Sequence, residues 1–575
     1  QIDLAFDKDK RIITVADNGI GMDKDELENN LGVIAQSGSF KFKQENTDTD
    51  KEEVDVIGQF GVGFYSAFMV AKKVTVISKA YGSDKAYQWE SEGVDGYTVT
   101  EADKKSAGTE IILELLDDTE DENYTEFLDQ YRIKSLVTKY SDYIRFPIKM
   151  EVSHSRPKEQ SEEDKEANKP LEYEDYIEVE TLNSMVPLWK KNKNELKEED
   201  YKHFYTEKFF DYNEPLKYAH ISNEMPSYNA LLYIPSKAPF DYYSKEYEKG
   251  LQLYSNGVLI MDKCADLLPD YFSFVKGLVD SEDLSLNISR EILQHDRQLR
   301  IIGQNLEKRI KGELEKMMRD DRPRYETFFA NFGTDLKVGV CDEYGRYKDF
   351  LRDLLIFYTD QDRQVTLKEY VEGMPESQKA IYFATADTVK RAMSLPQCEE
   401  VRKRGYELIY LTSPLDEMVL EALREQDGKR FCNVVTDDLG FETEEEKKAA
   451  EERDLENKEL LDFVKESVGE SVSKVRLSRK LSTQACCLTS EGGLTLEMER
   501  YFRHGPSEEM RKLRAVRVLE LNPEHHAFRA LQEAYANDRE KAKKLSQILS
   551  VLAELTAGMD VEDPAAFAEQ VAELF

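Results

Sequence analysis

The chain has 575 residues, a length that predicts roughly three to four domains. Its 115 acidic and 79 basic side chains give a formal net charge of -36, and this acidity argues against a nucleic-acid partner because phosphate binding draws on clustered Lys and Arg. No apolar run approaches the span of a bilayer, so no membrane partner is expected. The six cysteines show no C-x-x-C spacing, which disfavours a disulfide framework and a zinc site and favours a cytoplasmic protein.

The first predicted strands lead to a carboxylate. Apolar side chains alternate at Ile2, Leu4 and Phe6 as in a half-buried strand, and residues 7–10 form the turn into a second extended run, 11–16. Asp17 follows that run directly. Its carboxylate is therefore expected at a strand end, where it can accept a hydrogen bond from the exocyclic amine of adenine.

Two glycine-spaced boxes follow, Asp17-Asn18-Gly19-Ile20-Gly21-Met22 and Gly58-Gln59-Phe60-Gly61-Val62-Gly63-Phe64. The glycines of the first box lack the Cβ atoms that would hold a base away. The second box opens an apolar stretch, 64–70, which predicts a helix whose free N–H groups attract phosphates. Either box alone is commonly only a tight turn. Their order, followed by Gly108-Thr109 and the strand-like run 110–115, predicts a purine-nucleotide site.

These residues resemble the heat shock protein 90 chaperones, a branch of the ATPase superfamily that includes gyrase, mismatch-repair proteins and sensor histidine kinases. The resemblance is carried by residues 17–22, 30–38, 58–66 and 286–294, more loosely by 253–261, and runs essentially from end to end. It implies an α/β multidomain fold. The expected parts are an N-terminal Bergerat-type α/β sandwich ATPase domain, an α/β middle domain in two parts, and a mixed α+β C-terminal dimerisation domain.

The resemblance also implies roles for the nucleotide-site residues. Met22 would pack on the base, Thr109 would hold it through a water molecule, Asn30 would face the sugar and phosphates, and the amides from Gly61 to Phe64 would meet the phosphates. The full predicted set is Asp17, Asn18, Gly19, Ile20, Gly21, Met22, Asn30, Ser37, Gly38, Gly58, Gln59, Phe60, Gly61, Val62, Gly63, Phe64 and Thr109. Residues 39–57, polar and flanked by glycines, are interpreted as a lid, the alternative being a plain surface loop.

The chain departs from the family pattern at its start. Family members begin with a strand and a helix that carry a catalytic Glu and a magnesium-ligating Asn, whereas this chain begins at Gln1, after that segment. The ATPase domain is therefore expected to be incomplete and the fragment inactive, although the intact protein would use ATP and Mg²⁺. No residue of the chain is predicted as a metal ligand.

Residues 153–175 are rich in Glu, Asp and Lys without an apolar period, which predicts a short solvated linker. The region beyond it mixes strand-like runs such as 231–234 with helical ones such as 300–318, an α/β pattern in two parts. Within it, Arg290 and Gln294 lie four residues apart on one predicted helical face. By resemblance they are the catalytic candidates, because an Arg here would reach the γ-phosphate with its planar fork of donors. The alternative for Arg290 is an ordinary ion pair with Glu291 or Asp296.

The last region predicts helices with apolar faces. Residues 442–458 predict an exposed helix. Apolar side chains share one helical face between 545 and 555, and Asp563-Pro564 begins another helix, with Phe567, Val571 and Leu574 on one face. Such faces are usually core. At the end of a chain little protein is left to cover them, which favours interchain packing, and the resemblance implies a homodimer held there.

These observations predict an ATP-dependent molecular chaperone that binds client polypeptides and remodels them through a nucleotide-driven clamp cycle. The expected domains are 1–152 for nucleotide, 176–445 for the middle and 446–575 for dimerisation, around the linker 153–175. Trp189 and Phe329 are candidate client contacts. One alternative is a DNA-directed ATPase of the same superfamily, which conflicts with the acidic charge; another is a nucleotide-independent holdase for the fragment itself. The short linker and the last residues of the chain favour the bacterial type.

Overall fold

The computed structural model describes residues 1–33, 63–158, 173–282, 284, 297–361, 363–492, 494–503, 507–561 and 563–573. The chain forms two compact units, Gln1–Glu313 and Leu314–Phe575. Of the predicted site residues, Ser37, Gly38, Gly58, Gln59, Phe60, Gly61, Val62, Arg290 and Gln294 lie outside the described residues, as does the predicted lid.

The first unit opens with an eight-stranded sheet in the order β5-β4-β3-β6-β2-β1-β7-β8. β1 and β7 run parallel, and every other neighbouring pair in this sheet is antiparallel. The strands are β1 Ile2–Asp7, β2 Ile12–Asp17, β3 Ala71–Lys79, β4 Ala86–Ser91, β5 Tyr97–Ala102, β6 Gly108–Leu115, β7 Ile148–Pro157 and β8 Tyr173–Thr181.

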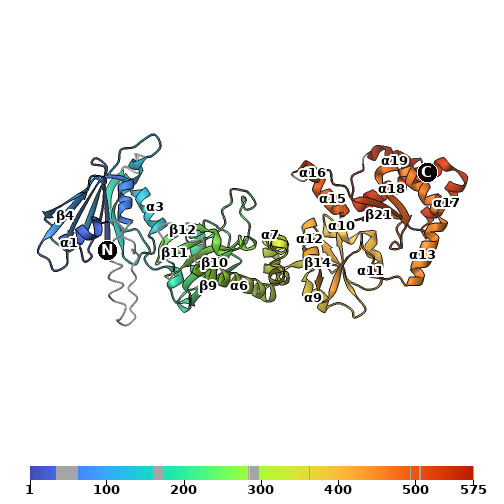
Figure 1. Ribbon diagram of the computed structural model, residues 1–575, viewed down its shortest axis with the longest axis horizontal. Helices are drawn as coiled ribbons and strands as arrows, with labels where there is room; N and C mark the ends of the chain where they lie inside the picture. Colours follow the sequence, from blue (N-terminus) through green and yellow to red (C-terminus); the bar gives the residue numbers. More distant parts are fainter. Residues whose placement is uncertain are drawn as a thin grey trace, which may run out of the picture. The chain divides into compact units, whose positions relative to one another are not determined.

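Helices cover one face of this sheet (Figure 1). They are α1 Lys24–Leu31, the 3-10 helices η1 Gly63–Met69 and η2 Tyr124–Leu128, and α3 Gln130–Tyr140. The alternation at Ile2, Leu4 and Phe6 turns these side chains toward α3, where they pack with Ile133 and Val137. The predicted two-layer α/β sandwich is confirmed.

The helix predicted for the segment 64–70 is present, but it is not an α-helix. The chain forms the tighter 3-10 helix η1, whose end is closed by the Val70 N–H donating to the Ala67 carbonyl, three residues back, at 3.2 Å. β3 begins at the next residue, Ala71. The β-branched side chains that follow favour a strand, so no room remains for a longer helix.

The predicted linker 153–175 is corrected at both ends. Residues 153–157 belong to β7 and residues 173–175 to β8, and the two strands pair from Lys149 opposite Thr181 to Pro157 opposite Tyr173. β8 is the edge strand of the sheet. An edge strand is held by backbone hydrogen bonds and stays largely in solvent, so it does not need the apolar period whose absence suggested a linker. Residues 159–172 lie outside the described part of the chain.

A second sheet in the first unit has five strands in the order β12-β11-β13-β10-β9. Its elements are α5 Glu198–Phe209, β9 Lys217–Glu224, β10 Ser227–Ile234, β11 Leu251–Ser255, β12 Val258–Cys264 and β13 Lys276–Asp280, and α6 Arg297–Asp320 follows. The predicted strand 231–234 and helix 300–318 are confirmed. Trp189 is wrong as a client contact, because its side chain is 0% exposed and its Nε1–H donates to Asp280 Oδ2 at 2.9 Å.

The second unit contains a six-stranded sheet in the order β15-β14-β17-β16-β19-β18, the second part of the predicted middle region. Its strands are β14 Ile356–Thr359, β15 Gln364–Thr366, β16 Ala380–Thr385, β17 Ile409–Leu411, β18 Glu425–Gln426 and β19 Lys429–Asn433. The helices around it are α7 Arg322–Cys341, α8 Lys348–Leu351, α9 Leu367–Glu372, α10 Val389–Met393, α11 Glu399–Lys403 and α12 Pro414–Leu423. Phe329, the other candidate client contact, is buried within α7, so that prediction is also wrong.

A three-stranded sheet, β20-β22-β21, completes the second unit. Its elements are α13 Glu444–Glu456, α14 Lys458–Val468, β20 Lys474–Leu477, β21 Cys486–Glu491, α15 Leu496–Arg503, α16 Glu508–Arg511, β22 Val516–Leu521, α17 His526–Asn537, α18 Arg539–Ala557 and α19 Pro564–Ala572. The predicted exposed helix is α13, and the predicted final helices are α18 and α19. Asp563 caps α19 as expected, because its Oδ1 accepts from the Ala566 N–H at 2.9 Å. Within the described residues, none of these helices is long and apolar enough to cross a membrane.

Candidate nucleotide site

The candidate site is one polar row at the end of an otherwise apolar sheet face. Strand pairing aligns Val76 with Ile111 and Ile111 with Val15, all on the face that the helices cover. Two residues further along each strand, the same face carries Ser78 opposite Thr109, with Asp17 next across the sheet. Register alone therefore brings three polar side chains together from β3, β6 and β2.

Asp17 is oriented by two backbone donors. Its Oδ1 accepts from the Gly19 N–H at 2.8 Å and from the Thr109 N–H at 3.3 Å. The first contact folds the chain after β2 into an Asx-type turn, and the second joins that turn to β6. The Asp17 side chain is otherwise exposed, so its carboxylate has acceptor capacity left for an amine.

Ser78 binds the same turn from the other side. Its Oγ accepts from the Met22 N–H at 2.8 Å and lies 2.9 Å from Thr109 Oγ1. Ser78 is a site residue that was not predicted from the sequence. A signal was present, because the strict alternation Val74, Val76, Ser78 in β3 places this hydroxyl on the covered face.

Two glycines let backbones approach closely beside this row. Gly21 has φ +66°, and a Cβ there would lie 1.9 Å from the Lys79 carbonyl oxygen. Gly108 has φ +122°, and a Cβ there would lie 2.1 Å from the Asp17 carbonyl oxygen. Both conformations and both contacts exclude a side chain. Room for the base, the reason predicted for Gly21, stays a prediction, and the structure gives a different reason for this glycine, room for the neighbouring strand.

The structure brings together Asp17, Gly19, Gly21, Met22 and Thr109 from the predicted set. Asn18 and Ile20 lie in the same turn with exposed side chains, and Asn30 lies in the last turn of α1, partly exposed. Gly63 and Phe64 begin η1, but the Phe64 ring packs edge-on against Trp89 at 5.5 Å. Its side chain thus serves the core, which leaves only its backbone for a ligand.

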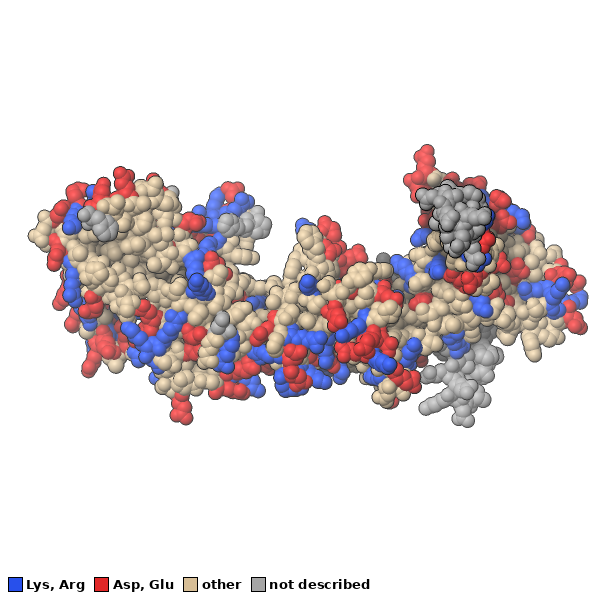
Figure 2. Space-filling view, turned by 180° about the vertical axis from the view of Figure 1, so that it is seen from behind, with Lys and Arg blue, Asp and Glu red and all other residues tan. Residues whose placement is uncertain are grey.

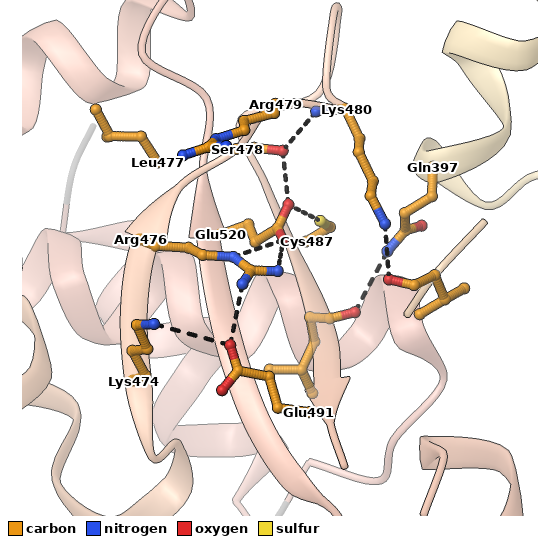
Figure 3. Close-up of polar contacts among 12 residues, drawn as sticks. Gln397, Lys474, Arg476, Leu477, Ser478, Arg479, Lys480, Cys487, Glu491 and Glu520 are labelled. Carbon is orange, nitrogen blue, oxygen red and sulfur yellow. Dashed lines mark hydrogen bonds and ion pairs between the residues drawn. The ribbon is translucent and has the colours of Figure 1, made fainter. Parts of the chain in front are cut away.

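A second charged cluster lies in the C-terminal sheet, where its polar groups bond to one another and to nearby backbone carbonyls. Arg476 donates to Glu520 Oε1 from Nε (3.0 Å) and Nη2 (2.7 Å), and Ser478 donates to Glu520 Oε2 at 2.7 Å (Figure 3). Lys480 donates to the carbonyls of Val434, Val435 and Asp437 at 3.0, 3.2 and 2.7 Å, and burial lowers the pKa of its ammonium. A groove of about 700 Å³ that carries both signs of charge is lined by Arg476, Ser478, Lys480 and Glu520 among others. Because Arg476 is paired with Glu520 and the Lys480 ammonium is satisfied by three backbone carbonyls, we interpret the cluster as structural.

Charge on the surface follows the same mixed pattern. On the face shown in Figure 2, acidic and basic side chains alternate over the described residues without a continuous basic band. Such a surface does not favour DNA. Also within the described residues, no group of three or more His, Cys, Asp or Glu side chains could hold a metal ion.

Comparison with protein families agrees with this geometry. Residues 1–118 match the family described as histidine kinase-, DNA gyrase B-, and HSP90-like ATPase. Residues 126–177 and 169–575 match the family described as Hsp90 protein. The sandwich with its Asp17 row is thus a nucleotide-binding ATPase domain, and the class of protein is an ATPase that couples this domain to further domains.

Curated relatives are similar to the chain along its whole length. Chaperone protein HtpG of Clostridium botulinum (strain Loch Maree / Type A3) is 51% identical over 575 residues, which cover 100% of this chain and 90% of that protein. HtpG of Bacillus subtilis (strain 168) is 50% identical over 572 residues, 99% of this chain and 90% of that protein. The chain belongs to the Hsp90 family. It is an ATP-dependent molecular chaperone of the type that HtpG represents.

Proposed function

We propose that Asp17 recognises the adenine of ATP and that this contact drives the chaperone cycle. The supporting observation is the fixed carboxylate, which is held by the Gly19 and Thr109 N–H groups beside a turn that Gly21 brings against β3. A Cβ at Gly19 would lie 2.9 Å from Asp17 Oδ1, so glycine there keeps the carboxylate open to a flat base. When bound, ATP with Mg²⁺ supplies a phosphoanhydride whose hydrolysis resets the conformation.

The remaining residues of the predicted set complete the proposal. Asn30 would face the sugar and phosphates, the amides of the second glycine box would bind phosphate oxygens, and Arg290 would meet the γ-phosphate with Gln294 beside it. The nucleotide domain would run from residue 1 through β8, which ends at Thr181, followed by the middle domain to 445 and the dimerisation domain 446–575. Clients are non-native polypeptides, the working form is a cytoplasmic homodimer joined through α18 and α19, and the DNA-directed alternative is not favoured by the family match.

The test of the proposed site is Asp17→Asn, with ATP affinity measured by isothermal titration calorimetry in the presence of Mg²⁺. Asn can still accept from the two backbone donors, but it presents either an NH₂ group or a neutral oxygen to the adenine amine. Loss of a hydrogen bond to a charged group costs about 1.5–3 kcal/mol, so the affinity should fall by roughly 10- to 150-fold.

The matched control is Glu151→Gln, the same acid-to-amide change at an exposed position of β7. It should leave the affinity for ATP unchanged. If Asp17→Asn binds ATP as tightly as Glu151→Gln does, the base is not recognised at Asp17 and the proposal fails.

A further inference from the structure

Ser78 is fully buried behind the candidate site. Its side chain is 0% exposed, so it cannot touch a nucleotide that binds over the Asp17 carboxylate. It nevertheless contacts three parts of the site at once: the Met22 N–H at 2.8 Å, Thr109 Oγ1 at 2.9 Å and the Gly108 carbonyl at 3.4 Å. A buried hydroxyl with this many partners constrains where each hydrogen points.

The hydrogens can be assigned by counting donors. The Met22 N–H can only donate, so Ser78 Oγ accepts there. Ser78 then has one hydrogen to give, either to Thr109 Oγ1 at 2.9 Å or to the Gly108 carbonyl at 3.4 Å. If it goes to the Gly108 carbonyl, Thr109 donates to Ser78 Oγ instead, and the Ser78 hydrogen keeps only the longer and weaker hydrogen bond. The Ser78 hydrogen therefore favours Thr109. When Ser78 donates to Thr109, the hydrogen of the Thr109 hydroxyl is left free to point into the site.

We infer that Ser78 is a positioning residue that makes the Thr109 hydroxyl a hydrogen-bond donor to the nucleobase, so that the site prefers adenine to guanine. The inference rests on the proposed adenine contact of Asp17. Adenine offers an amine to the carboxylate and, at the adjacent N1, an acceptor for the Thr109 hydroxyl, directly or through one water molecule. Guanine has a carbonyl oxygen where adenine has the amine, and an N1–H donor where adenine has the N1 acceptor. A donor at Thr109 beside an acceptor at Asp17 therefore matches adenine alone.

The test compares the ATP and GTP affinities of the intact protein and of its Ser78→Ala variant by calorimetry. Without Ser78, the Thr109 hydroxyl rotates freely and the Met22 N–H loses its acceptor. ATP binding should weaken about tenfold while GTP binding changes little, so the preference for ATP should fall by about tenfold, the size expected for one misplaced hydrogen bond. Ser78→Thr, which keeps the hydroxyl, should restore most of the preference.

The matched control is Ser91→Ala. Ser91 is also a buried strand serine of the same sheet, in β4, but its Oγ bonds only the local turn, donating to the Gly96 carbonyl at 2.6 Å and accepting from the Gly93 N–H at 3.0 Å. It should leave the ratio of ATP to GTP affinities unchanged. A general loosening of the sheet would instead alter both variants alike, and that result would overturn the inference.

Two further variants test whether Ser78 acts through Thr109 and provide an alternative if Ser78→Ala does not fold. In a Thr109→Val background, Ser78→Ala should cause no additional loss of ATP preference because the hydroxyl that it orients is gone; an additive loss contradicts the inference. If Ser78→Ala does not fold, Ser78→Cys, of similar shape but a weak donor, should show the same fall in preference. Failure of the intact protein to bind ATP would reject the proposed function, whereas ATP binding with an unchanged preference in Ser78→Ala or Ser78→Cys rejects only this inference.

Discussion

The close approach at Gly21 gives a prediction whose magnitude follows from the geometry. In Gly21→Ala the new Cβ would lie 1.9 Å from the Lys79 carbonyl oxygen, whereas ordinary contacts begin at 3.4 Å. The turn must therefore retreat by about the difference, 3.4 minus 1.9, or roughly 1.5 Å. That shift breaks two hydrogen bonds that hold the turn to the sheet, from the Met22 N–H to Ser78 (2.8 Å) and from the Tyr81 N–H to the Ile20 carbonyl (2.7 Å).

The costs can be added. A left-handed φ costs a non-glycine residue about 1–2 kcal/mol, and two lost hydrogen bonds cost about 1 kcal/mol each. Gly21→Ala should thus destabilise the N-terminal sheet by about 3–4 kcal/mol and weaken ATP binding at least tenfold, as measured by urea unfolding and by calorimetry.

A neighbouring glycine separates the two contributions. Gly82, in the turn after β3, has φ +80° but open space around its Cβ position. Gly82→Ala should cost only the conformational part, about 1–2 kcal/mol, and leave ATP affinity unchanged. If Gly21→Ala costs no more than Gly82→Ala, the contact between the turn and β3 does not hold the site, and the reasoning is refuted.

Two predictions concern the second unit. Burial raises the pKa of Glu497 to about 7 and outweighs the neighbouring Arg500. The carboxyl ionises near 4.5 in the unfolded chain, so the contribution of Glu497 to stability is fully present below that pH and falls by about 2–3 kcal/mol as the pH rises to 7. Urea unfolding of Glu497→Gln should lack this fall, and an equal slope in both proteins would contradict the assignment. For the dimer, Leu552 and Leu555 of α18 are 37% and 46% exposed. Changing both leucines to Asp should yield a monomer in sedimentation. The control Leu455→Asp, at a 71% exposed leucine of α13, should leave the mass unchanged. If the Leu552 and Leu555 double variant remains a dimer, the proposed interface through α18 is refuted.

Strong local patterns made much of the first sheet predictable. The alternation at Ile2, Leu4 and Phe6 has one physical reading, a strand with one face in the core, and it placed Asp17 at a strand end. Gly21 was predicted from its residue type, although its contact with Lys79 was not, because that approach joins segments 58 residues apart in the chain, 79 minus 21. Ser78 was missed for the same reason. The alternation in β3 places its hydroxyl on the covered face, but its partner Thr109 lies 31 residues away in the chain and is set by the register of β3 against β6.

Other predictions failed because burial is decided by the whole fold. Trp189 was considered as a surface contact, but it lies among Tyr143, Tyr205 and Tyr254 in a core built from distant segments. The charged stretch 153–175 has the composition of a linker, yet its ends pair as β7 and β8. A charged composition shows only that the side chains prefer solvent. The side chains of an edge strand can lie in solvent while its backbone pairs within the sheet.

This hairpin has a mechanical consequence. Where β8 ends, Leu182 enters the same core as α3, and Asn183 accepts from the Ile148 N–H at 2.8 Å while its amide donates to the carbonyls of Ile144 and Phe146 at 2.8 and 3.0 Å. A force applied to the chain at Asn183 therefore acts directly on the paired strands β7 and β8, with no flexible segment in between. The chain stays held past this point, because the N–H groups of Ser184 and Met185 both donate to Asp142 at 2.9 Å.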